Sequence, residues 1–542
     1  MSCPDIPPIT GERFRSRRSV VVTTRGVVAT SQPLAAQAGL RMLLAGGSAA
    51  DAVIAAAAAL NVVEPMSTGI GGDAFALVYD APTRTVRALN GSGRAPAVLS
   101  RETFAARGLT AIPTTGMLPV TVPGAVDAWI ELLAAHGRLP LAEVLAPAIE
   151  YAEQGFPVSE IIARGWKLAE PKLAAHPDAA RTYLPEGRAP RAGERFRQPG
   201  LARSLRQIAA GGRDAFYQGP IAAAIVATSA RDGGVLTAAD LAAHRSTWET
   251  PINVAYRGYT VYEIPPNGQG ITALMALNIL NGFDLAGLAP ASPQALHLQI
   301  EALRLAFADA AAYVADPAHV AVPTGWLLSP ERAAARRALI DPERALPVVR
   351  SMPLPGGHDT VYVTAVDAEG NAVSFINSLY MGFGSGVVAG DTGICLQNRG
   401  AGFVLDPAHP NCVAPGKRPY HTIIPCMVTR GDRLWASFGV MGGFMQPQGH
   451  VQVLVNMIDH GMNPQEALDA PRFELIDPYL RQEAVALEHD PAVAAALAAR
   501  GHVIAAQQGM FGFGGGQVIV VDEAGVRHAG SDPRKDGCAV AY

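Results

Sequence analysis

The strongest constraint on the fold is an abrupt change in residue pattern near position 358. Residues 323–355 are rich in arginine and proline and are followed by two glycines, which is typical of an exposed linker that can be cut. Residues 360–367 and 372–380 then alternate between apolar and polar side chains on either side of a turn, which predicts a β-hairpin of two core strands. The part from 123 to about 350 is mostly helical in pattern. We therefore expect an α/β protein with antiparallel strands and helices to either side.

Other segments extend this picture toward both ends of the chain. Residues 27–63 are expected to be mainly helical, with a break at Gly46-Gly47 and an alanine-rich second helix from about Ser48 to Val63. The small side chains of that second helix predict close packing against a sheet. The remaining expected elements are strands at 74–79, 252–256, 259–264, 422–428, 434–439, 517–521 and 526–529, and a helix at about 448–460.

Composition and charge exclude several classes of protein. Hydrophobic residues make up 49% of the 542 residues and charged residues 17%, so the chain can bury a large core and is not disordered. Its formal net charge of −4 is too close to balance for a protein that binds nucleic acid. No apolar stretch reaches the roughly 18 to 20 residues that cross a bilayer, and the amino-terminus lacks the apolar core of a signal peptide. Five cysteines without CxxC spacing predict reduced thiols, so we expect a cytoplasmic protein without nucleic-acid or membrane partners.

The first candidate for chemistry is Thr360, which follows the glycine linker and opens a strand. A threonine at such a place can be an ordinary strand residue. If the chain is cut between Asp359 and Thr360, however, Thr360 becomes an N-terminal nucleophile whose own α-amine can act as general base. A free α-amine has a pKa of about 7.7–8.0, which suits a base near neutral pH.

A second candidate is the pair Gly442-Gly443, which follows a predicted strand. These glycines can form a simple turn, or their backbone N–H groups can face a developing oxyanion. Segment 382–386 lacks the spacing of a serine-hydrolase elbow. No histidine pair has metal-binding spacing, and we expect no metal and no cofactor. The histidines considered were His358, His409, His421 and His450.

Many ordered motifs resemble those of the γ-glutamyltransferase family. The resemblance covers about residues 25–540, and its many motifs make it specific. The motifs of the second part of the chain are Asp359-Thr360, 367–374, 383–386, 393–398, 415–419, Gly442-Gly443, 463–473 and 531–534. Those of the first part are 46–52, 69–73, 94–96, 122–125 and 265–270.

This resemblance implies an N-terminal-nucleophile (Ntn) hydrolase fold, an αββα sandwich made as a precursor that cleaves itself. The large subunit would be 1–359 and the small subunit 360–542, and the two would form one domain and remain together as a heterodimer. Matched position by position, Thr360 is the nucleophile, Ser378 is the hydroxyl that supports it, and Gly442 and Gly443 lie at the oxyanion site.

The residues expected to bind the substrate depart from the family pattern. Tyr380 stands where the family has an asparagine, and 399–403 (Arg-Gly-Ala-Gly-Phe) replaces the stretch Gln-Met-Asp-Asp-Phe, whose carboxylate holds the substrate amino group. His421-Thr422 replaces a pair of serines, and the family's large-subunit arginine falls at Ser92, with Arg94 two residues on. The chain therefore resembles the branch that includes cephalosporin acylase-like and oxamate amidohydrolase-like members.

Two functional classes follow. The first is an active amidase for a small-molecule amide whose acyl group bears a free carboxylate, held by Arg94 or Arg399, in a pocket that includes Tyr380, His421 and Thr422. Within this class, true γ-glutamyl or glutathione hydrolysis or transpeptidation stays open. The second class is an unprocessed, inactive binding relative. Intact Thr360 and Ser378 favour the enzyme.

Overall fold

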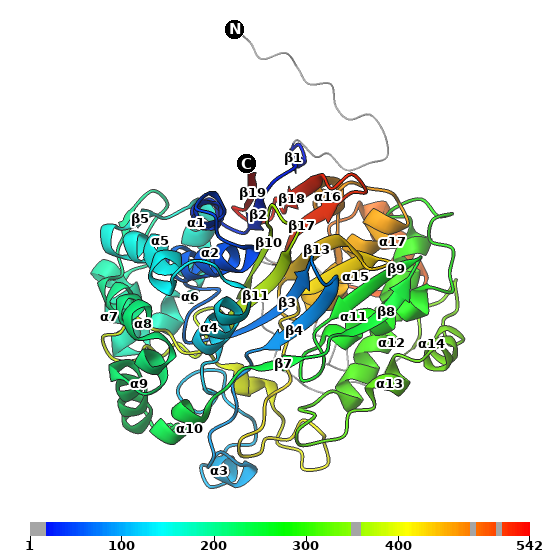
Figure 1. Cartoon of the computed structure of the whole chain (residues 1–542). Coiled ribbons are helices and arrows are strands. Elements are labelled where there is room, and N and C mark those ends of the chain that lie inside the picture. The colour runs from blue at the N-terminus through cyan, green and yellow to red at the C-terminus, as the bar shows by residue number, and fades with distance from the viewer. Residues whose placement is uncertain (1–17, 348–358, 477–483, 506–511) are drawn as a thin grey trace.

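The computed structural model describes residues 18–347, 359–476, 484–505 and 512–542. Two antiparallel seven-stranded sheets stack face to face in its centre (Figure 1). In spatial order, the first sheet contains β19 (Cys538–Ala541), β2 (Val27–Thr30), β10 (Asp359–Val366), β11 (Ala372–Tyr380), β3 (Asp73–Asp80), β4 (Thr85–Asn90) and β7 (Thr247–Glu249). The second contains β1 (Val21–Thr23), β18 (Arg527–Ser531), β17 (Gly515–Val521), β13 (Arg433–Met441), β12 (Cys426–Arg430), β9 (Tyr259–Glu263) and β8 (Ile252–Tyr256).

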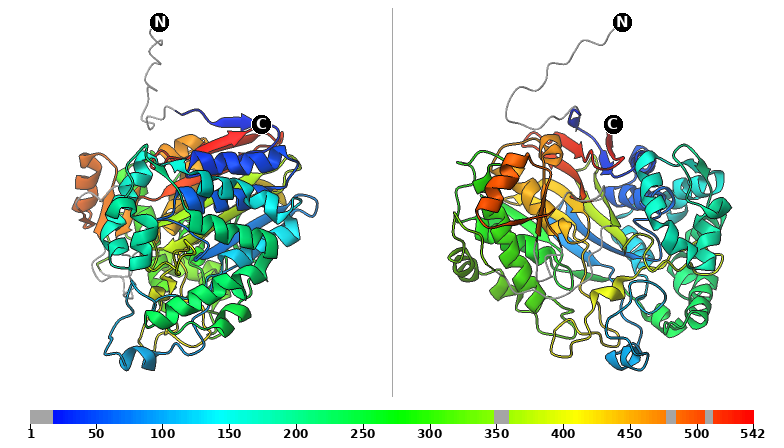
Figure 2. Two further views of the ribbon diagram at one scale, coloured as in Figure 1. Left: turned by 90° about the vertical axis from the view of Figure 1, so that its left-hand side faces the viewer. Right: turned by 180° about the vertical axis from the view of Figure 1, so that it is seen from behind.

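Helices cover the outer face of each sheet, and Figure 2 shows these layers from the side and from behind. The first sheet carries α1 (Pro33–Leu44), α2 (Ala49–Val63), α4 (Ala125–His136) and α5 (Leu141–Gln154), with α6 (Glu160–Ala174), α7 (Pro177–Tyr183), α8 (Pro199–Tyr217), α9 (Pro220–Arg231) and α10 (Ala238–Ala243) farther out. The second carries α11 (Gly270–Leu280), α12 (Pro293–Tyr313), α13 (Thr324–Leu327), α14 (Pro330–Arg337), α15 (Met445–Ile458), α16 (Pro464–Asp469) and α17 (Pro491–Ala499). The expected αββα sandwich is confirmed.

The smaller elements lie outside the two central sheets. A three-stranded sheet contains β14 (Phe473–Ile476), β15 (Ala484–Leu487) and β16 (Val503–Ile504), and β5 (Phe156–Pro157) pairs with β6 (Arg195–Phe196). Short helices are α3 (Arg101–Ala105), η1 (Pro185–Gly187) and η2 (Arg399–Gly402).

The helix α2 shows how the sequence produces the first layer. Ser48 accepts a hydrogen bond from the Asp51 amide, and the Asp51 carboxylate accepts one in return from the Ser48 amide, which caps the helix where it was predicted to begin. Every residue of α2 is buried. Its alanines leave little side chain between helix and sheet, so α2 packs closely over β10 and β11.

Alternation along β10 determines which side chains face the second sheet. Val361 and Val363 belong to the core under α2, whereas Tyr362 belongs to the core between the sheets. Because successive side chains of a strand point to opposite faces, Thr360 shares the inter-sheet face of Tyr362. The same period in β11 places Ser378 on this face.

Some expectations about secondary structure were wrong. Residues 27–30, which were included in a helical region, form β2 between β10 and β19. The strand expected from residue 422 begins at Cys426, because the residues before it turn toward side chains of other segments. The strands β4 and β19 were not predicted.

Each sheet contains strands from both sides of position 360. β2 and β3 flank the β10–β11 hairpin, and β9 pairs with β12. Within the described residues, no helix has both the length and the apolar character that crossing a bilayer requires. The four described cysteines are free, as expected, and Cys3 lies outside the described residues.

Candidate active site

The site is centred on Thr360, at the start of β10 and buried between the sheets. Its Oγ lies 3.1 Å from the Oγ of Ser378, which comes from β11 beside it. The Thr360 hydroxyl also donates to the carbonyl oxygen of Asp359 at 2.6 Å. The expected nucleophile and its supporting hydroxyl are therefore in contact, next to the peptide bond at which cleavage was predicted.

Ser378 has further polar neighbours. Its hydroxyl donates to the Asp359 carbonyl oxygen at 3.1 Å. It accepts hydrogen bonds from the Tyr380 amide at 2.8 Å and from the Arg399 guanidinium at 3.2 Å. The backbone of Tyr380 can reach back to Ser378 because the chain turns there with a φ of +83°.

Arg399, at the start of η2, brings a full positive charge to this cluster. Its side chain is 0% exposed. One end of the guanidinium donates to Ser378 and the other to the Thr422 hydroxyl at 2.7 Å, and its centre lies 4.1 Å above the Tyr380 ring. Burial lowers the pKa of Arg399 to about 10, so it remains a cation at neutral pH. Among the described residues, no carboxylate lies within ion-pair distance of it, and its Nε has no hydrogen-bond partner.

His421 and Asp73 form the next part of the network. His421 Nε2 lies 3.1 Å from an oxygen of Asp73, and its Nδ1 accepts from the Ile423 amide. Burial lowers the pKa of His421 well below its ordinary value, so the ring is neutral and donates to Asp73. Burial also raises the pKa of Asp73 to about 6, although the charge of Arg399 opposes this. The other oxygen of Asp73 accepts from the amides of Gly93 and Gly124 and from Gln397.

Gly442 and Gly443 follow the end of β13 with φ of +131° and +60°. The pairing across the sheets brings this end toward Thr360, since Thr364 bonds to Ser437 and the Tyr362 ring packs on Gly439. Gln269 also connects the two regions, because its amide donates to the carbonyl oxygens of both Thr422 and Gly443. The amides of the two glycines donate to no acceptor among the described residues. They are thus available to a substrate oxygen, and the oxyanion role stays a prediction.

Comparison with known proteins places this site in a family. The gamma-glutamyltranspeptidase family model matches residues 35–542. The chain belongs to the gamma-glutamyltranspeptidase family. It is 42% identical over 526 residues to the glutathione hydrolase-like YwrD proenzyme of Bacillus subtilis, covering 96% of this chain and 99% of the relative. It is 39% identical over 536 residues to the oxamate amidohydrolase proenzyme of Klebsiella pneumoniae, with 96% and 99% covered.

A solved structure agrees with these relatives. The crystal structure of cephalosporin acylase from Bacillus halodurans has a TM-score of 0.91 and 48% identity, covering 98% of both chains. The predicted resemblance is therefore confirmed, and the chain is a hydrolase or acylase of the gamma-glutamyltranspeptidase family with the Ntn fold. Several relatives are named proenzymes.

The structure gathers most of the predicted site residues of this family member and separates one. Thr360, Ser378, Tyr380, Arg399 and Thr422 are linked by contacts, and His421 joins them through Asp73 and the charge of Arg399. The Arg94 side chain is 35% exposed and lies 3.9 Å from Asp316. Within the described residues it makes no contact with Thr360, Ser378 or Arg399.

Two residues of the network were missed. Asp73 ends the motif 69–73 that carried the resemblance, but nothing in the sequence indicated its contact with His421, 348 positions away. Gln269 lies in motif 265–270 and was likewise not assigned a role. The sequence feature that could have indicated a role for Asp73 and Gln269 is that each is a polar residue inside a glycine-rich motif.

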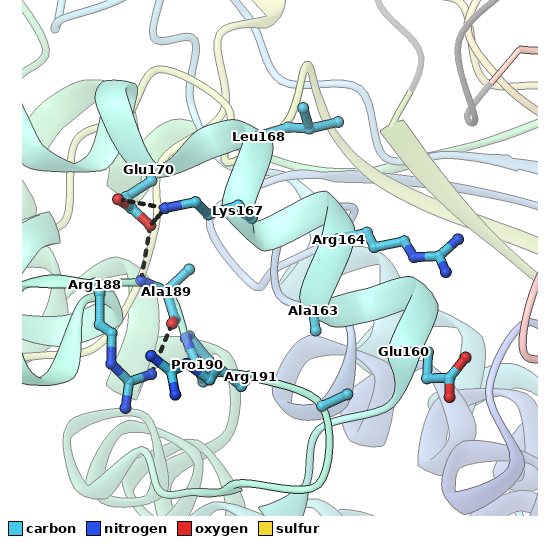
Figure 3. A pocket seen from close by; sticks show the side chains of 11 residues that line it. Glu160, Ala163, Arg164, Lys167, Leu168, Glu170, Arg188, Ala189, Pro190 and Arg191 are labelled. Atoms are coloured by element: carbon cyan, nitrogen blue, oxygen red, sulfur yellow. Dashed lines mark hydrogen bonds and ion pairs between the residues drawn. The ribbon is translucent and has the colours of Figure 1, made fainter.

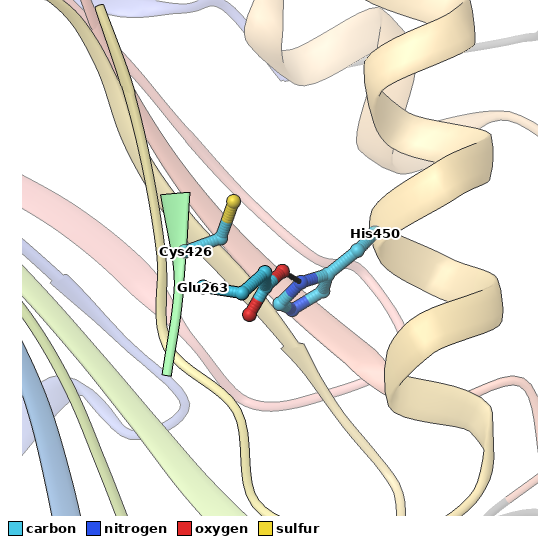
Figure 4. Close-up of side chains that lie close together, drawn as sticks. All are labelled: Glu263, Cys426 and His450. Carbon is cyan, nitrogen blue, oxygen red and sulfur yellow. Dashed lines mark hydrogen bonds and ion pairs between the residues drawn. The ribbon is translucent and has the colours of Figure 1, made fainter. Parts of the chain in front are cut away.

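Two buried groups of side chains have donor types that suit a metal. Figure 4 shows Glu263, Cys426 and His450, and the other group is His297, Glu301 and His502. In the first group, His450 Nδ1 lies 2.7 Å from a Glu263 oxygen. In the second, His297 Nδ1 lies 2.8 Å from His502 Nε2. Two ligands of one tetrahedral zinc ion would be about 3.4 Å apart. These side chains therefore form hydrogen-bonded pairs, and neither group contacts Thr360.

An open pocket of about 1050 Å³ lies along α6, on the outer helical layer (Figure 3). Charged and apolar side chains line it. Lys167 bonds to Glu170, and Glu170 accepts from the Ala189 amide. None of the residues in the network around Thr360 lines this pocket, so the pocket is separate from the candidate active site.

Proposed function

We propose that this protein is an amide hydrolase that cleaves itself between Asp359 and Thr360 and then acts through an acyl-Thr360 intermediate. We further propose that it prefers acyl groups with a free carboxylate. The single observation that carries the substrate preference is Arg399, a fully buried guanidinium that forms no ion pair with a carboxylate of the described residues and lies one hydroxyl away from Thr360.

The chemistry follows from the geometry around Thr360. Cleavage frees the α-amine of Thr360, which takes the proton of its own hydroxyl. The hydroxyl oxygen attacks the substrate carbonyl carbon, and the amides of Gly442 and Gly443 stabilise the oxyanion. The leaving amine takes the proton and departs, and water then hydrolyses the ester and restores Thr360. No step uses a metal or a cofactor.

The two products of self-cleavage, 1–359 and 360–542, remain together in this account. Each central sheet contains strands from both, so separating them would expose the buried inter-sheet core. We place the mature heterodimer in the cytoplasm because its described cysteines are free thiols.

The substrate preference follows from electrostatics. A guanidinium binds a carboxylate through two parallel hydrogen bonds and keeps its charge near neutral pH. Leaving such a charge buried and unpaired costs about 2–5 kcal/mol, and a substrate carboxylate would remove that cost. The α-ammonium of a γ-glutamyl group would be repelled by Arg399. Tyr380, stacked on the guanidinium, limits the length of the acyl group. Amides of short dicarboxylic acids without an α-amino group, such as glutaryl or oxamate-like substrates, fit these constraints.

A second candidate is hydrolysis or transfer of a true γ-glutamyl group. Asp73 favours it, because this buried carboxylate lies in the same network and, with a pKa of about 6, is largely charged at pH 7. It could pair with an α-ammonium. The inactive binding relative is less well supported, since the Thr360–Ser378 pair is complete.

The test compares kcat/KM of the cleaved enzyme for glutaryl and γ-glutamyl anilides, which share a leaving group. We expect the glutaryl substrate to be at least tenfold better, about 1.4 kcal/mol of transition-state binding. A tenfold preference for γ-glutamyl would overturn the proposal in favour of the second candidate.

Two arginine variants identify the carboxylate-binding group. Arg399→Gln should reduce the ratio of glutaryl to γ-glutamyl hydrolysis, and Arg94→Gln, the matched control, should leave the ratio unchanged. The opposite result would assign the carboxylate to Arg94.

A further inference from the structure

We infer that Arg399 also acts before any substrate binds, by directing the Ser378 proton toward the scissile carbonyl during self-cleavage. This inference rests on the proposed cleavage between Asp359 and Thr360. It assigns Arg399 a positioning role in maturation that is separate from binding a substrate carboxylate.

The hydrogen-bonding capacity of Ser378 limits what its hydroxyl can do. A serine hydroxyl has one proton to donate and two lone pairs that accept. The Tyr380 amide and the Arg399 guanidinium donate to its oxygen at 2.8 and 3.2 Å. Both lone pairs are thereby occupied. The single proton of Ser378 must point elsewhere, and the remaining polar atoms in reach are the Asp359 carbonyl oxygen and Thr360 Oγ, each at 3.1 Å.

Ser378 is consequently a donor toward the reacting group. It cannot take the Thr360 proton while Arg399 and the Tyr380 amide occupy its oxygen. A base role for Ser378 in the uncleaved chain is therefore inconsistent with this arrangement, and an electrophilic role is consistent with it. The Ser378 hydroxyl donates to the oxygen on which negative charge develops when the Asp359 carbonyl is attacked.

The self-cleavage step can be written with all atoms accounted for. Thr360 Oγ bonds to the Asp359 carbonyl carbon, and the carbonyl oxygen becomes an oxyanion that accepts from Ser378. The oxyanion collapses, the bond to the Thr360 nitrogen breaks, and the hydroxyl proton ends on that nitrogen. Water then adds to the ester, which leaves a carboxylate on Asp359, returns one proton to Thr360 Oγ and gives the other proton to the freed Thr360 amine.

The positive charge of Arg399 strengthens this arrangement. A cation that donates to a hydroxyl oxygen makes the hydroxyl a stronger donor, and the effect is large where water is excluded. Arg399 is held in place by the Thr422 hydroxyl and the Tyr380 ring. All three residues lie after position 360, so the cut would leave them in the same product.

The test follows the rate at which freshly synthesised full-length chains are cut, measured by mass spectrometry under denaturing conditions. Arg399→Met should cut at least tenfold more slowly than the wild type. Arg418→Met is the matched control. Arg418 is also a buried arginine, 5% exposed, but it bonds to the Ser92 carbonyl and not to Ser378. The Arg418→Met chain should be cut at the wild-type rate. Equal slowing of both variants, or a wild-type rate for Arg399→Met, would overturn the inference.

A double-mutant cycle tests whether Arg399 acts through Ser378. If it does, Ser378→Ala and the double variant Ser378→Ala with Arg399→Met should be cut at the same slow rate. If the double variant is slowed by the product of the two single-variant effects, the two residues act independently and Arg399 has a merely structural role. If Arg399→Met does not fold, Arg399→Lys and Arg418→Lys decide in its place, and only the former should slow cleavage. A wild type that is not cut before Thr360 would instead refute the proposed cleavage itself.

Discussion

The two sides of the candidate active site, which carry the proposed nucleophile and the proposed substrate-binding residues, are built in different ways. The nucleophile side consists of the adjacent strands β10 and β11, whose pairing, with a register shift between Asp359 and Val361, places Thr360 beside Ser378. The substrate side consists of irregular segments, with Arg399 in η2 and His421-Thr422 just before β12. Thr360 and Ser378 on the first side match the residues that the family resemblance implies, whereas Tyr380 at the end of β11 and the residues of the second side depart from them.

This difference has a physical cause. A residue in a central strand is fixed by ladder hydrogen bonds and by packing on both faces, so a change there disturbs the whole sheet. A residue in an irregular segment is fixed by a few local bonds, such as that of Arg399 with Thr422. Substrate preference can therefore change on this side while the nucleophile stays in place.

The largest expected effect is on the proposed oxyanion contact at Gly442, which follows β13 and faces the nucleophile side from the second sheet. Gly442→Ala should lower kcat of the cleaved enzyme about 10²–10³-fold, as loss of an oxyanion donor does elsewhere. Gly442 has a φ of +131°, and an added Cβ would lie 3.0 Å from the Gly514 Cα, so an alanine would displace the backbone amide. Steady-state kinetics on a glutaryl anilide would measure the loss of kcat.

The control for this variant is Gly431→Ala, in the turn between β12 and β13. Gly431 also has a positive φ, +61°, but an added Cβ there meets nothing within 4 Å. It should lose some stability and keep kcat. Similar losses of kcat in both variants would show that backbone strain, rather than a lost donor, causes the effect.

A smaller effect is expected from Asp73, which begins β3 and contacts His421 of the substrate side. Its pKa is raised by burial from 3.8 to about 6, so the folded protein holds this proton more tightly than the unfolded chain. Stability from this group is therefore present below about pH 4 and lost as pH rises to 6, by about 3 kcal/mol in total. Asp73→Asn should remove that dependence, which would appear as a Tm difference from the wild type that changes between pH 4 and 7.

Glu64 provides the comparison for Asp73. Burial raises its pKa to about 7, and it bonds to Ser31 at the end of α2, outside the network around Thr360. Glu64→Gln should change the pH dependence of Tm without changing that of kcat. Asp73→Asn should change both. If Asp73→Asn leaves the pH profile of kcat unaltered, Asp73 is only structural.

The smallest expected effect is that of chelators, which should leave activity unchanged, because the Thr360 amine and the glycine amides supply the base and the oxyanion contacts. Assays with and without a chelator would check this. Loss of activity that one divalent ion restores would contradict it, and would direct attention to Glu263, Cys426 and His450.

The sequence predicted the β10–β11 hairpin and α2 well, because each has a strong local signal. The hairpin alternates with period two around a turn, and α2 begins at a serine cap. β2 was assigned wrongly because Val27–Ala29 is a short apolar run that fits a buried strand as well as a helix. β19 is four residues long and pairs with β2 more than 500 positions away, and no local pattern reports such pairing.

The residues of the candidate site also differ in how far the sequence could predict their contacts. Thr360, Ser378 and Tyr380 lie on one hairpin, so the alternation that predicts the strands also places these residues together. Arg399 and Thr422 were found through the family resemblance, but the contacts of Arg399 with Thr422 and with Ser378 depend on irregular backbone. The Asp73–His421 bond joins segments far apart in sequence, which no spacing rule connects.

Intact-mass analysis of the purified, denatured protein tests the central claim most directly. The wild type should give two chains, 1–359 and 360–542, and Thr360→Ala should give one uncut chain without amidase activity. If Thr360→Ala is still cut at the same bond, or if an uncut wild type hydrolyses amides at the full rate, Thr360 is not the nucleophile that this account requires.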